Sequence, residues 1–297
     1  MQWRSANHYF RARFGCKVYK LALDGGMTCP NRDGTLDTRG CIFCSAGGSG
    51  DFAEPLCGSI EEQLDRAKSR VAAKAGPDAR YIAYFQSYTN TYAPAERLEA
   101  LFAPVLARPE IVALSVATRP DCLPAPVLDL LERLNREKPV FVELGLQTIH
   151  PQTAAFIRRG YDLPVFDRAM RELLARGLEP IVHVILGLPG EDETDMLETV
   201  RYVGASGAAG IKLQLLHVLE HTDLAALWRQ GKVPTMTLEE YAVLLGRCLQ
   251  VLPPEIVIHR LTGDGAKKDL LAPLWTADKK HVLNYMNQYL RGLPNVL

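Results

Sequence analysis

The sequence predicts an α/β fold, a partial (β/α)6 TIM-like barrel of parallel strands with an N-terminal extension and a C-terminal strand and helix. Two observations support this prediction. Short, continuously apolar segments rich in Val, Ile and Leu recur along the chain, as is typical of strands covered on both faces. Amphipathic segments separate them, and this alternation favours a parallel sheet with right-handed crossovers. A doubly wound open sheet is the alternative architecture.

The predicted strands are residues 18–23, 80–86, 111–117, 140–147, 181–187, 211–218 and 255–260. The helices predicted between and after them are residues 59–76, 94–107, 124–137, 164–177, 192–207, 237–252 and 278–291. Capping boxes mark two helix starts, because Ser59 precedes Glu62 by three residues and Thr237 precedes Glu240 likewise. We interpret residues 1–297 as one domain, with the core barrel at about 17–220 and a C-terminal extension at about 221–297.

The composition argues against several classes of protein, among them membrane-spanning and secreted proteins. The chain has 297 residues, 47% of them hydrophobic, and 34 Lys+Arg balance 34 Asp+Glu, so charge alone does not indicate a strongly basic nucleic-acid binder. No apolar stretch approaches the roughly 18–20 residues that span a bilayer. The N-terminal segment also lacks the apolar core of a signal peptide. We therefore expect a cytoplasmic protein that is not associated with a membrane.

Three of the seven cysteines lie in one irregular stretch, residues 24–54. Cys29, Cys41 and Cys44 follow the first predicted strand with the spacing Cys-x11-Cys-x2-Cys, and loops after strands build the active-site face of α/β barrels. An odd cysteine count in a reducing compartment argues against a disulfide framework. Cys122 and Cys248 are expected to be buried apolar residues. The clustered cysteines therefore predict a metal site.

Two kinds of metal site compete for this loop. A structural zinc site takes four protein ligands and leaves no open position. Cys16 could be the fourth ligand, but it lies before the first strand, which should place it at the opposite end of the barrel. An iron–sulfur cube normally takes four thiolates, so three would leave one iron with an open coordination position. Three ligands thus favour catalysis. Cys57 directly precedes a helix cap and fits a buried thiol, with a spare ligand or a radical-quenching thiol as the alternatives.

The loop, with its strand and barrel context, resembles radical S-adenosylmethionine (SAM) enzymes. Most of that superfamily uses Cys-x3-Cys-x2-Cys, and the first gap here is stretched to eleven residues. The stretched form resembles the radical SAM domain of the Elongator catalytic subunit and, more closely, a bacterial YhcC-like group. The resemblance covers about Tyr9 to Gly265 and is carried by KVYKLALDGGMTCPNRDG, GCIFC, YFQSYTNTYAP, ATRPDCLP, VELGLQTIH, GLPGE, LQLLHVL and RLTGDG.

This resemblance implies the cofactors. Cys29, Cys41 and Cys44 would hold a 4Fe-4S cluster whose open iron binds the amino and carboxylate groups of SAM. One electron, from an external donor such as flavodoxin or ferredoxin, would cleave the sulfonium bond. The products would be methionine and a 5′-deoxyadenosyl radical, which takes a hydrogen atom from the substrate. The protein would position these groups and exclude water.

The resemblance also suggests residues for the ribose and adenine of SAM. Glu143, Gly145 and Gln147 alternate along one strand and so share a face, and we expect Glu143 and Gln147 to hold ribose hydroxyls. Gly187 and Pro189 end the fifth strand and would pack against adenine. The alternatives are a polar pair that satisfies itself inside the barrel and an ordinary turn with a helix cap.

Four further residues are predicted to bind the amino-acid part of SAM. Gln86 and Asn90 lie at the polar end of the second strand, which in related enzymes helps to hold the SAM amino group. Arg119 and Arg159 could each pair with a carboxylate, because a guanidinium can do so with two hydrogen bonds. Taken singly, each arginine also fits a salt bridge or a surface position.

Substrate contacts are predicted at the mouth of the barrel. Gln214 and His217 would follow the sixth strand, and Asp264 lies after the last strand near the same face. His183 and Lys212 lie on strands with apolar neighbours, and a hydrogen-bonded core role is the expectation for a lone histidine there.

Basic and aromatic residues interleave in the segment that ends at Arg32, and lysines recur near the C-terminus, a pattern that suits RNA as well as ordinary solvated faces. The related families favour RNA, because they are assigned to the wobble uridine of tRNA. For the YhcC-like group, the step converts a 5-carboxymethylaminomethyl side chain to aminomethyl. We therefore predict a tRNA-modifying radical SAM enzyme. The alternatives are a radical SAM enzyme acting on a small metabolite or peptide, and a zinc-stabilised, non-catalytic RNA-binding protein.

Overall fold

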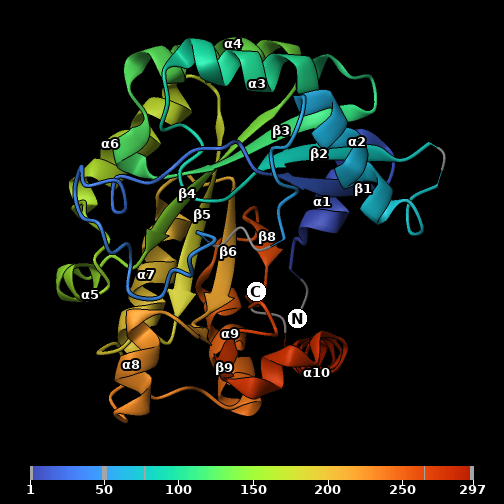
Figure 1. Ribbon diagram of the computed structural model, residues 1–297. Coiled ribbons are helices and arrows are strands. Elements are labelled where there is room, and N and C mark those ends of the chain that lie inside the picture. Colours follow the sequence, from blue (N-terminus) through green and yellow to red (C-terminus); the bar gives the residue numbers. More distant parts are fainter. Residues whose placement is uncertain (1–2, 49–51, 77, 264, 295–297) are drawn as a thin grey trace.

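A single parallel sheet organises the computed structural model, which describes residues 3–48, 52–76, 78–263 and 265–294. Its strands follow the order β1-β2-β3-β4-β5-β6-β8, and the sheet curls into an open half-barrel with helices on its outer face (Figure 1). These strands are β1 (Val18–Leu23), β2 (Arg80–Phe85), β3 (Ile111–Thr118), β4 (Val140–Gln147), β5 (Glu179–Leu186), β6 (Gly210–Leu215) and β8 (Val257–Arg260). The predicted partial barrel is confirmed.

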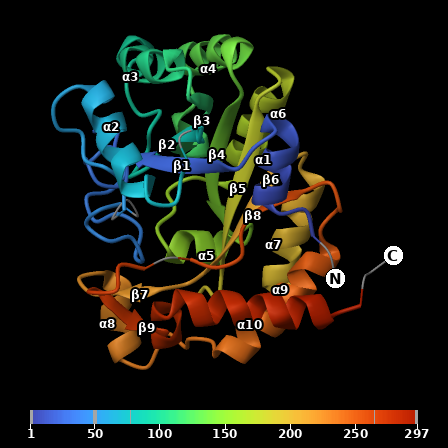
Figure 2. The same cartoon turned by 90° about the vertical axis from the view of Figure 1, so that its right-hand side faces the viewer.

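Most of the helices connect successive strands. The helices are α1 (Ala6–Phe14), α2 (Ile60–Val71), α3 (Ala95–Ala107), α4 (Ala125–Glu137), α5 (Pro151–Phe156), α6 (Leu163–Ala175), α7 (Glu193–Ala205), α8 (Asp223–Arg229), α9 (Leu238–Val251) and α10 (Lys279–Gly292). Of these, α2, α3, α4, α6 and α7 pack against the strands of the main sheet. Both predicted capping boxes are present, at Ser59 and Thr237. Figure 2 shows α10 running across the end of the molecule where α8 and α9 lie.

The sixth predicted strand is shorter than expected. The sequence predicts it at 211–218, but β6 ends at Leu215, and Val218–Leu219 forms a separate strand, β7. β7 pairs antiparallel with β9 (Leu270–Ala272) in a second, two-stranded sheet. Between β6 and β7 the ring Nδ1 of His217 lies 2.9 Å from the carbonyl oxygen of Leu215, a hydrogen bond that accompanies the turn away from the barrel.

An N-terminal helix closes the end of the half-barrel where the strands begin. α1 starts at the N-cap Ser5, which accepts a hydrogen bond from the His8 amide. Its buried residue Phe10 packs in a separate apolar cluster with Ile82, Ala113, Phe141 and Ile181, which come from β2, β3, β4 and β5. The residue before the cap, Arg4, accepts a main-chain hydrogen bond of 2.8 Å from the amide of Ile258 in β8. The opposite end, where the strands finish, stays open.

Two short 3-10 helices, Pro120–Cys122 and Leu274–Ala277, complete the elements. Within the described ranges, no helix combines the length and apolar character required to cross a membrane.

Candidate active site

A cavity of about 250 Å³ opens at the carboxyl ends of the strands. Cys29, Cys41 and Cys44 line it together, as the loop spacing predicts. Five more of the predicted residues contribute side chains from other strands and loops: Gln86, Arg119, Glu143, Gln147 and Arg159. The two predicted substrate residues Gln214 and His217 line it as well. The parallel topology thus brings ten sequence-predicted residues into one cavity.

The cysteine loop is tied to the turn after α5. The Nδ2 atom of Asn31 donates to the carbonyl oxygens of Arg158 (2.7 Å) and Arg159 (3.2 Å), and lies 3.4 Å from the Sγ atom of Cys41. Burial, together with negative charge on the neighbouring Cys44, raises the pKa of the Cys41 thiol to about 11. Asn31, which the sequence did not single out, therefore positions the central cysteine.

A second set of contacts holds the end of the loop. The guanidinium of Arg32 donates to the carbonyl oxygens of Cys44 (2.9 Å) and Ser45 (2.7 Å) and lies 5.6 Å from the ring centre of Tyr88. Tyr88 follows β2 with a φ of 53°, and its amide donates to the carbonyl oxygen of Gly48 at 3.1 Å. Gly48 has a φ of 60°, and a Cβ atom there would lie 2.4 Å from the Tyr88 ring. Only glycine fits this position without a shift.

We expect Gly48→Ala to loosen the cysteine loop. The left-handed backbone alone costs about 1–2 kcal/mol for a residue with a side chain, and the new methyl group would collide with Tyr88. Iron bound after anaerobic reconstitution should fall relative to the wild type. Gly76→Ala is the matched control, because a Cβ atom there meets nothing within 4 Å. Equal iron retention in both variants would contradict this account of the loop.

The donor set fits a cluster held by three thiolates. Negative charge on Cys44 or Cys29 raises the pKa of Cys41, and a cationic metal group bound beside these residues would offset this effect. The cavity continues beside Cys41 towards β4 and β5. Cys16 does not belong to the cavity lining. The predicted burial of Cys57 is wrong, because Cys57 is exposed, whereas Cys122 and Cys248 are buried as expected.

Glu143 is the centre of a buried charged network inside the half-barrel. Its side chain has no exposure, and its Oε1 atom accepts from Lys20 Nζ (2.8 Å) and Ser115 Oγ (2.7 Å). Its Oε2 atom accepts from Lys212 Nζ and lies 2.8 Å from His183 Nε2. The Glu143 carboxylate thus has four partners from β1, β3, β5 and β6. The sequence suggests two roles for Glu143. The structure shows one, a polar group satisfied inside the barrel, and the other, a contact with the SAM ribose, stays a prediction.

The network shifts the pKa of several members. Burial opposes the charged form of Glu143, but Lys20, Lys212 and His183 together hold its pKa well below the usual value. Burial lowers the pKa of Lys212 to about 7, against the attraction of Glu143. Burial, with the charge of Lys212, lowers the pKa of His183 to about 4, so His183 is neutral at pH 7. The network therefore combines one carboxylate, a neutral histidine and a lysine, Lys212, whose charge is lost as pH rises through about 7.

Gln147 departs from the regular strand pattern. The pairing of β4 with β5 shifts between Gly145 and Gln147, and Gln147 has a φ of 69°. The pairing of the strand is thus irregular at Gln147, yet Glu143, Gly145 and Gln147 share one face as predicted, because all three line the cavity. Within the described part of the chain, the buried Oε1 atom of Gln147 has no hydrogen-bond partner. This orphaned acceptor suits a ligand hydroxyl such as those of the SAM ribose.

The two predicted arginines have different surroundings. Arg119 makes a bidentate ion pair with Asp121, at 2.9 Å and 2.7 Å, and this interaction together with Cys29 and Cys41 raises its pKa. Arg159 is 3% exposed and, among the described residues, donates only to main-chain carbonyl oxygens, including that of Tyr161 (2.9 Å). Within the described part of the chain its buried charge has no carboxylate within ion-pair distance, and burial lowers its pKa. Arg159 is the better placed of the two to receive an anionic group.

Three of the predicted residues that the structure describes do not line the cavity: Asn90, Gly187 and Pro189. Asn90 is fully buried, and its Nδ2 atom donates to the carbonyl oxygens of Ser87 (2.8 Å) and Ala117 (3.3 Å), so it shapes the end of β2. Gly187 packs against Met236 and Leu216. Pro189 lies in the turn that follows. Asp264 lies outside the described residues, and its neighbours Gly263 and Gly265 both line the cavity.

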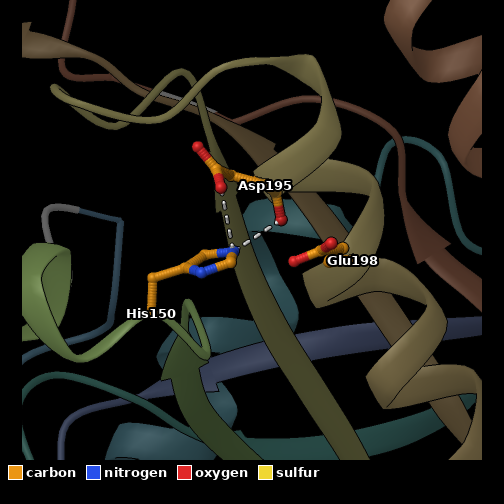
Figure 3. A group of neighbouring side chains, drawn as sticks. All are labelled: His150, Asp195 and Glu198. Carbon is orange, nitrogen blue, oxygen red and sulfur yellow. Dashed lines mark hydrogen bonds and ion pairs between the residues drawn. The ribbon is translucent and has the colours of Figure 1, made fainter.

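A separate group of possible metal ligands lies away from this cavity. His150, Asp195 and Glu198 have ligand atoms within 4.8 Å of one another (Figure 3). The Nε2 atom of His150 already bonds to the main-chain oxygen of Asp195 at 2.9 Å, and the Asp195 carboxylate accepts from the Asp192 amide in the capping box of α7. These bonds join the start of α5 to α7, and we assign them a structural role.

Comparisons with known proteins agree with this geometry. Residues 38–203 match the Radical SAM superfamily, and residues 208–292 match the Radical_SAM C-terminal domain. The chain is 43% identical to Bacillus subtilis YtqA, over 98% of this chain and 90% of YtqA. It is 39% identical to Escherichia coli YhcC, over 94% of this chain and 89% of YhcC.

More distant similarities reach the Elongator-related proteins. The chain is 26% identical to the tRNA uridine(34) acetyltransferase of Methanocaldococcus jannaschii, over 55% of this chain and 32% of that protein. The structure of Methanocaldococcus infernus Elp3 matches the fold with a TM-score of 0.67 at 18% identity, over 93% of this chain and 64% of that one. Radical SAM proteins bind a 4Fe-4S cluster and SAM. Three cysteines line one cavity of a half-barrel, and the family models and relatives match most of the chain. The chain therefore belongs to the radical SAM superfamily, among the relatives of YhcC.

Proposed function

We propose that this radical SAM enzyme modifies the wobble uridine of tRNA, converting a 5-carboxymethylaminomethyl side chain to aminomethyl, with an external reductant as its electron donor. When bound, the cluster and SAM supply one-electron chemistry that can break an unactivated C–H bond. Loss of a hydrogen atom from the methylene between the nitrogen and the carboxylate, then of an electron to the external redox partner and of the N–H proton, would give an imine. Hydrolysis of the imine by water would release the aminomethyl product and the two-carbon unit as glyoxylate.

Cys29, Cys41 and Cys44 would hold the cluster, and the remaining wall of the cavity would orient SAM and exclude water. Gln147 and Arg159 are the residues best placed to hold SAM. Among the described residues, the buried Oε1 atom of Gln147 has no hydrogen-bond partner, and the Arg159 guanidinium bonds to carbonyl oxygens and to no carboxylate.

The observation that carries the substrate assignment is a second cavity, of about 770 Å³, beside the first. Six cationic side chains line it: Lys20, Lys212, Arg260, Lys267, Lys268 and Lys279. No Asp or Glu belongs to its described lining, although the chain as a whole has equal numbers of both charges. Such a surface suits a polyanion, because lysines near phosphates release condensed counterions. The similarity to a tRNA uridine(34) acetyltransferase favours tRNA as that polyanion.

The proposed function is tested by nucleoside analysis. Anaerobically reconstituted protein is incubated with SAM, a reductant and tRNA bearing 5-carboxymethylaminomethyluridine, and the digested nucleosides are examined by mass spectrometry. We expect the 5-aminomethyl nucleoside to accumulate with wild-type protein and not with Cys41→Ala. Normal SAM cleavage with an unchanged wobble nucleoside would contradict the tRNA assignment.

The exposed lysines of the second cavity should contribute to tRNA binding. Lys267 and Lys268 are exposed at its rim. We expect Lys267→Gln/Lys268→Gln to weaken tRNA binding and to reduce the slope of log affinity against log salt by about 0.7–0.9 for each phosphate that the protein no longer neutralises. Filter binding at several salt concentrations measures both quantities.

The matched control for this pair is Lys74→Gln/Lys232→Gln, because both lysines are exposed and line neither cavity. The control should keep the wild-type slope. Equal slopes in the two double variants would place the tRNA elsewhere, and salt-independent binding would favour a small metabolite or peptide as substrate.

A further inference from the structure

The two cavities share a wall, and that wall carries several buried charges. Tyr84, Gln86, Lys212, Arg260 and Gly265 line both cavities. A group bound at this wall from the side of the second cavity would therefore lie next to the space that begins at the cysteines. The chemistry of the wall decides which substrate group is bound there.

Among the described residues, the wall sets two lysines against one carboxylate. The Glu143 carboxylate faces the side chains of Lys20 and Lys212. Arg260 lies beside them, and its Nη1 atom is 3.5 Å from Gln214 Oε1. His183 adds no charge, because it is neutral at pH 7. Lys212 is only 3% exposed, so its charge is buried when it is protonated. An excess of buried charge is costly unless an opposite charge joins it.

Glu143 has no capacity left to balance the excess. A carboxylate offers about four acceptor positions, and Lys20, Ser115, Lys212 and His183 occupy them. Lys212, in contrast, has three protons to donate and among the described residues donates to Glu143 and Tyr84. The wall therefore combines a filled acceptor with cations that can accommodate another one.

We propose that Lys212 and Arg260, supported by Lys20, form a carboxylate-binding site that holds the acidic group of the substrate. The identity of that substrate rests on the proposed function, in which the acidic group is the carboxymethyl end of the modified uridine. Held at the shared wall, the carboxylate directs the methylene carbons beside it towards the cofactor cavity. The enzyme would thus recognise the group that it removes, and would reject a side chain that lacks it.

The site should bind more tightly at lower pH. The titratable and charged groups that face Lys212 are Lys20 from β1, Tyr84 from β2, Glu143 from β4, His183 from β5, and His259 and Arg260 from β8. The pKa of Lys212 is lowered to about 7, so its charge is lost as pH rises through that value. A bound carboxylate favours the protonated lysine, and affinity for it should therefore fall as pH rises from about 6 to about 8.

The test uses N-acetylglycine as the probe and its uncharged amide, N-acetylglycinamide, as the comparison. Binding to the reconstituted holoenzyme with SAM is measured by ligand-observed NMR. We expect the wild type to bind the acid and not the amide. Lys212→Met and Arg260→Met should each weaken acid binding by about tenfold or more, as expected for loss of a hydrogen bond to a charged group. Lys232→Met, an exposed lysine outside both cavities, should leave it unchanged.

Lys212→Met removes a partner of Glu143 and could reduce binding by disturbing the fold. Arg260→Met leaves all four partners of Glu143 in place, so a loss of binding in this variant reports on the site itself. Undiminished binding of the acid by both variants, or equal binding of acid and amide, overturns the inference. SAM cleavage without tRNA is also measured. If Lys212→Met and Arg260→Met raise the KM for SAM in this reaction, the inference is overturned, because the carboxylate bound at the wall would then be that of SAM. Carboxylate-selective binding without conversion of the wobble nucleoside supports the site and contradicts the proposed function instead.

Discussion

Replacing Cys41 with alanine is expected to abolish cluster binding and to reduce 5′-deoxyadenosine formation to the uncatalysed background. Cys41 is the central thiol of the loop, and its Sγ atom lies against Asn31 and near the carbonyl oxygen of Arg158 (3.6 Å). Removing one of three thiolates leaves a second iron without a protein ligand, and two thiolates do not retain such a cluster. Iron and sulfide content after anaerobic reconstitution, the visible absorbance and product chromatography measure the loss.

Cys57→Ala is the matched control for this loss. Cys57 is exposed and is thirteen residues beyond Cys44, outside the cavity lining. It should retain wild-type iron and activity. A Cys41→Ala protein that still cleaves SAM would contradict the assignment of the metal site, and a Cys57→Ala protein that loses iron would show that a fourth thiol contributes. Zinc in place of iron would restore the structural zinc alternative.

Replacing Glu143 with glutamine is expected to destabilise the fold more than any other single change discussed above. The substitution keeps the shape but leaves the buried charge of Lys20 and Lys212 without its counter-ion. Breaking a buried ion pair in this way costs about 3–5 kcal/mol. The midpoint of guanidinium unfolding should fall accordingly. Glu99→Gln is the control, because Glu99 pairs with Arg133 on the surface and should change the midpoint little.

The pH dependence of this effect follows from the lowered pKa of Glu143. A carboxyl whose pKa is lower in the folded state stabilises the fold above its unfolded value, about 4.3 for glutamate. The difference in stability between the wild type and Glu143→Gln should therefore be complete at neutral pH and shrink as pH falls towards the folded-state pKa. A difference that is absent at neutral pH would show that the network does not stabilise the barrel.

The fold could be predicted because its signals are local. The apolar runs of β3, β4 and β5 are buried on both faces, so they are continuous in the sequence, and only a parallel sheet with helical connections accommodates them. The helix α1 carried no such signal, since Phe10 is its only buried residue. Its stability derives from packing against strands that follow much later in the chain.

The metal ligands could be predicted for a similar reason, since three cysteines in one loop need no knowledge of tertiary structure. The residues that hold this loop could not. Asn31 and Arg32 resemble ordinary loop residues, and their partners in the turn after α5 and in the Cys44–Ser45 segment are set by the folded conformation. The role of Lys20 could not be predicted either, because it lies in an apolar segment of the sequence. Its contact with Glu143 depends on how strands that are distant in the sequence align in the sheet.

The hydrogen bond between Arg4 and Ile258 has a consequence for biosynthesis. It joins one of the first described residues to the last strand of the main sheet, so it forms only after most of the chain has left the ribosome. Until then the β6 edge, which β8 later covers, has unpaired main-chain groups. Contacts between such distant residues also slow folding. The nascent protein therefore passes through a stage with an open sheet edge, and such an edge is prone to pair with other chains.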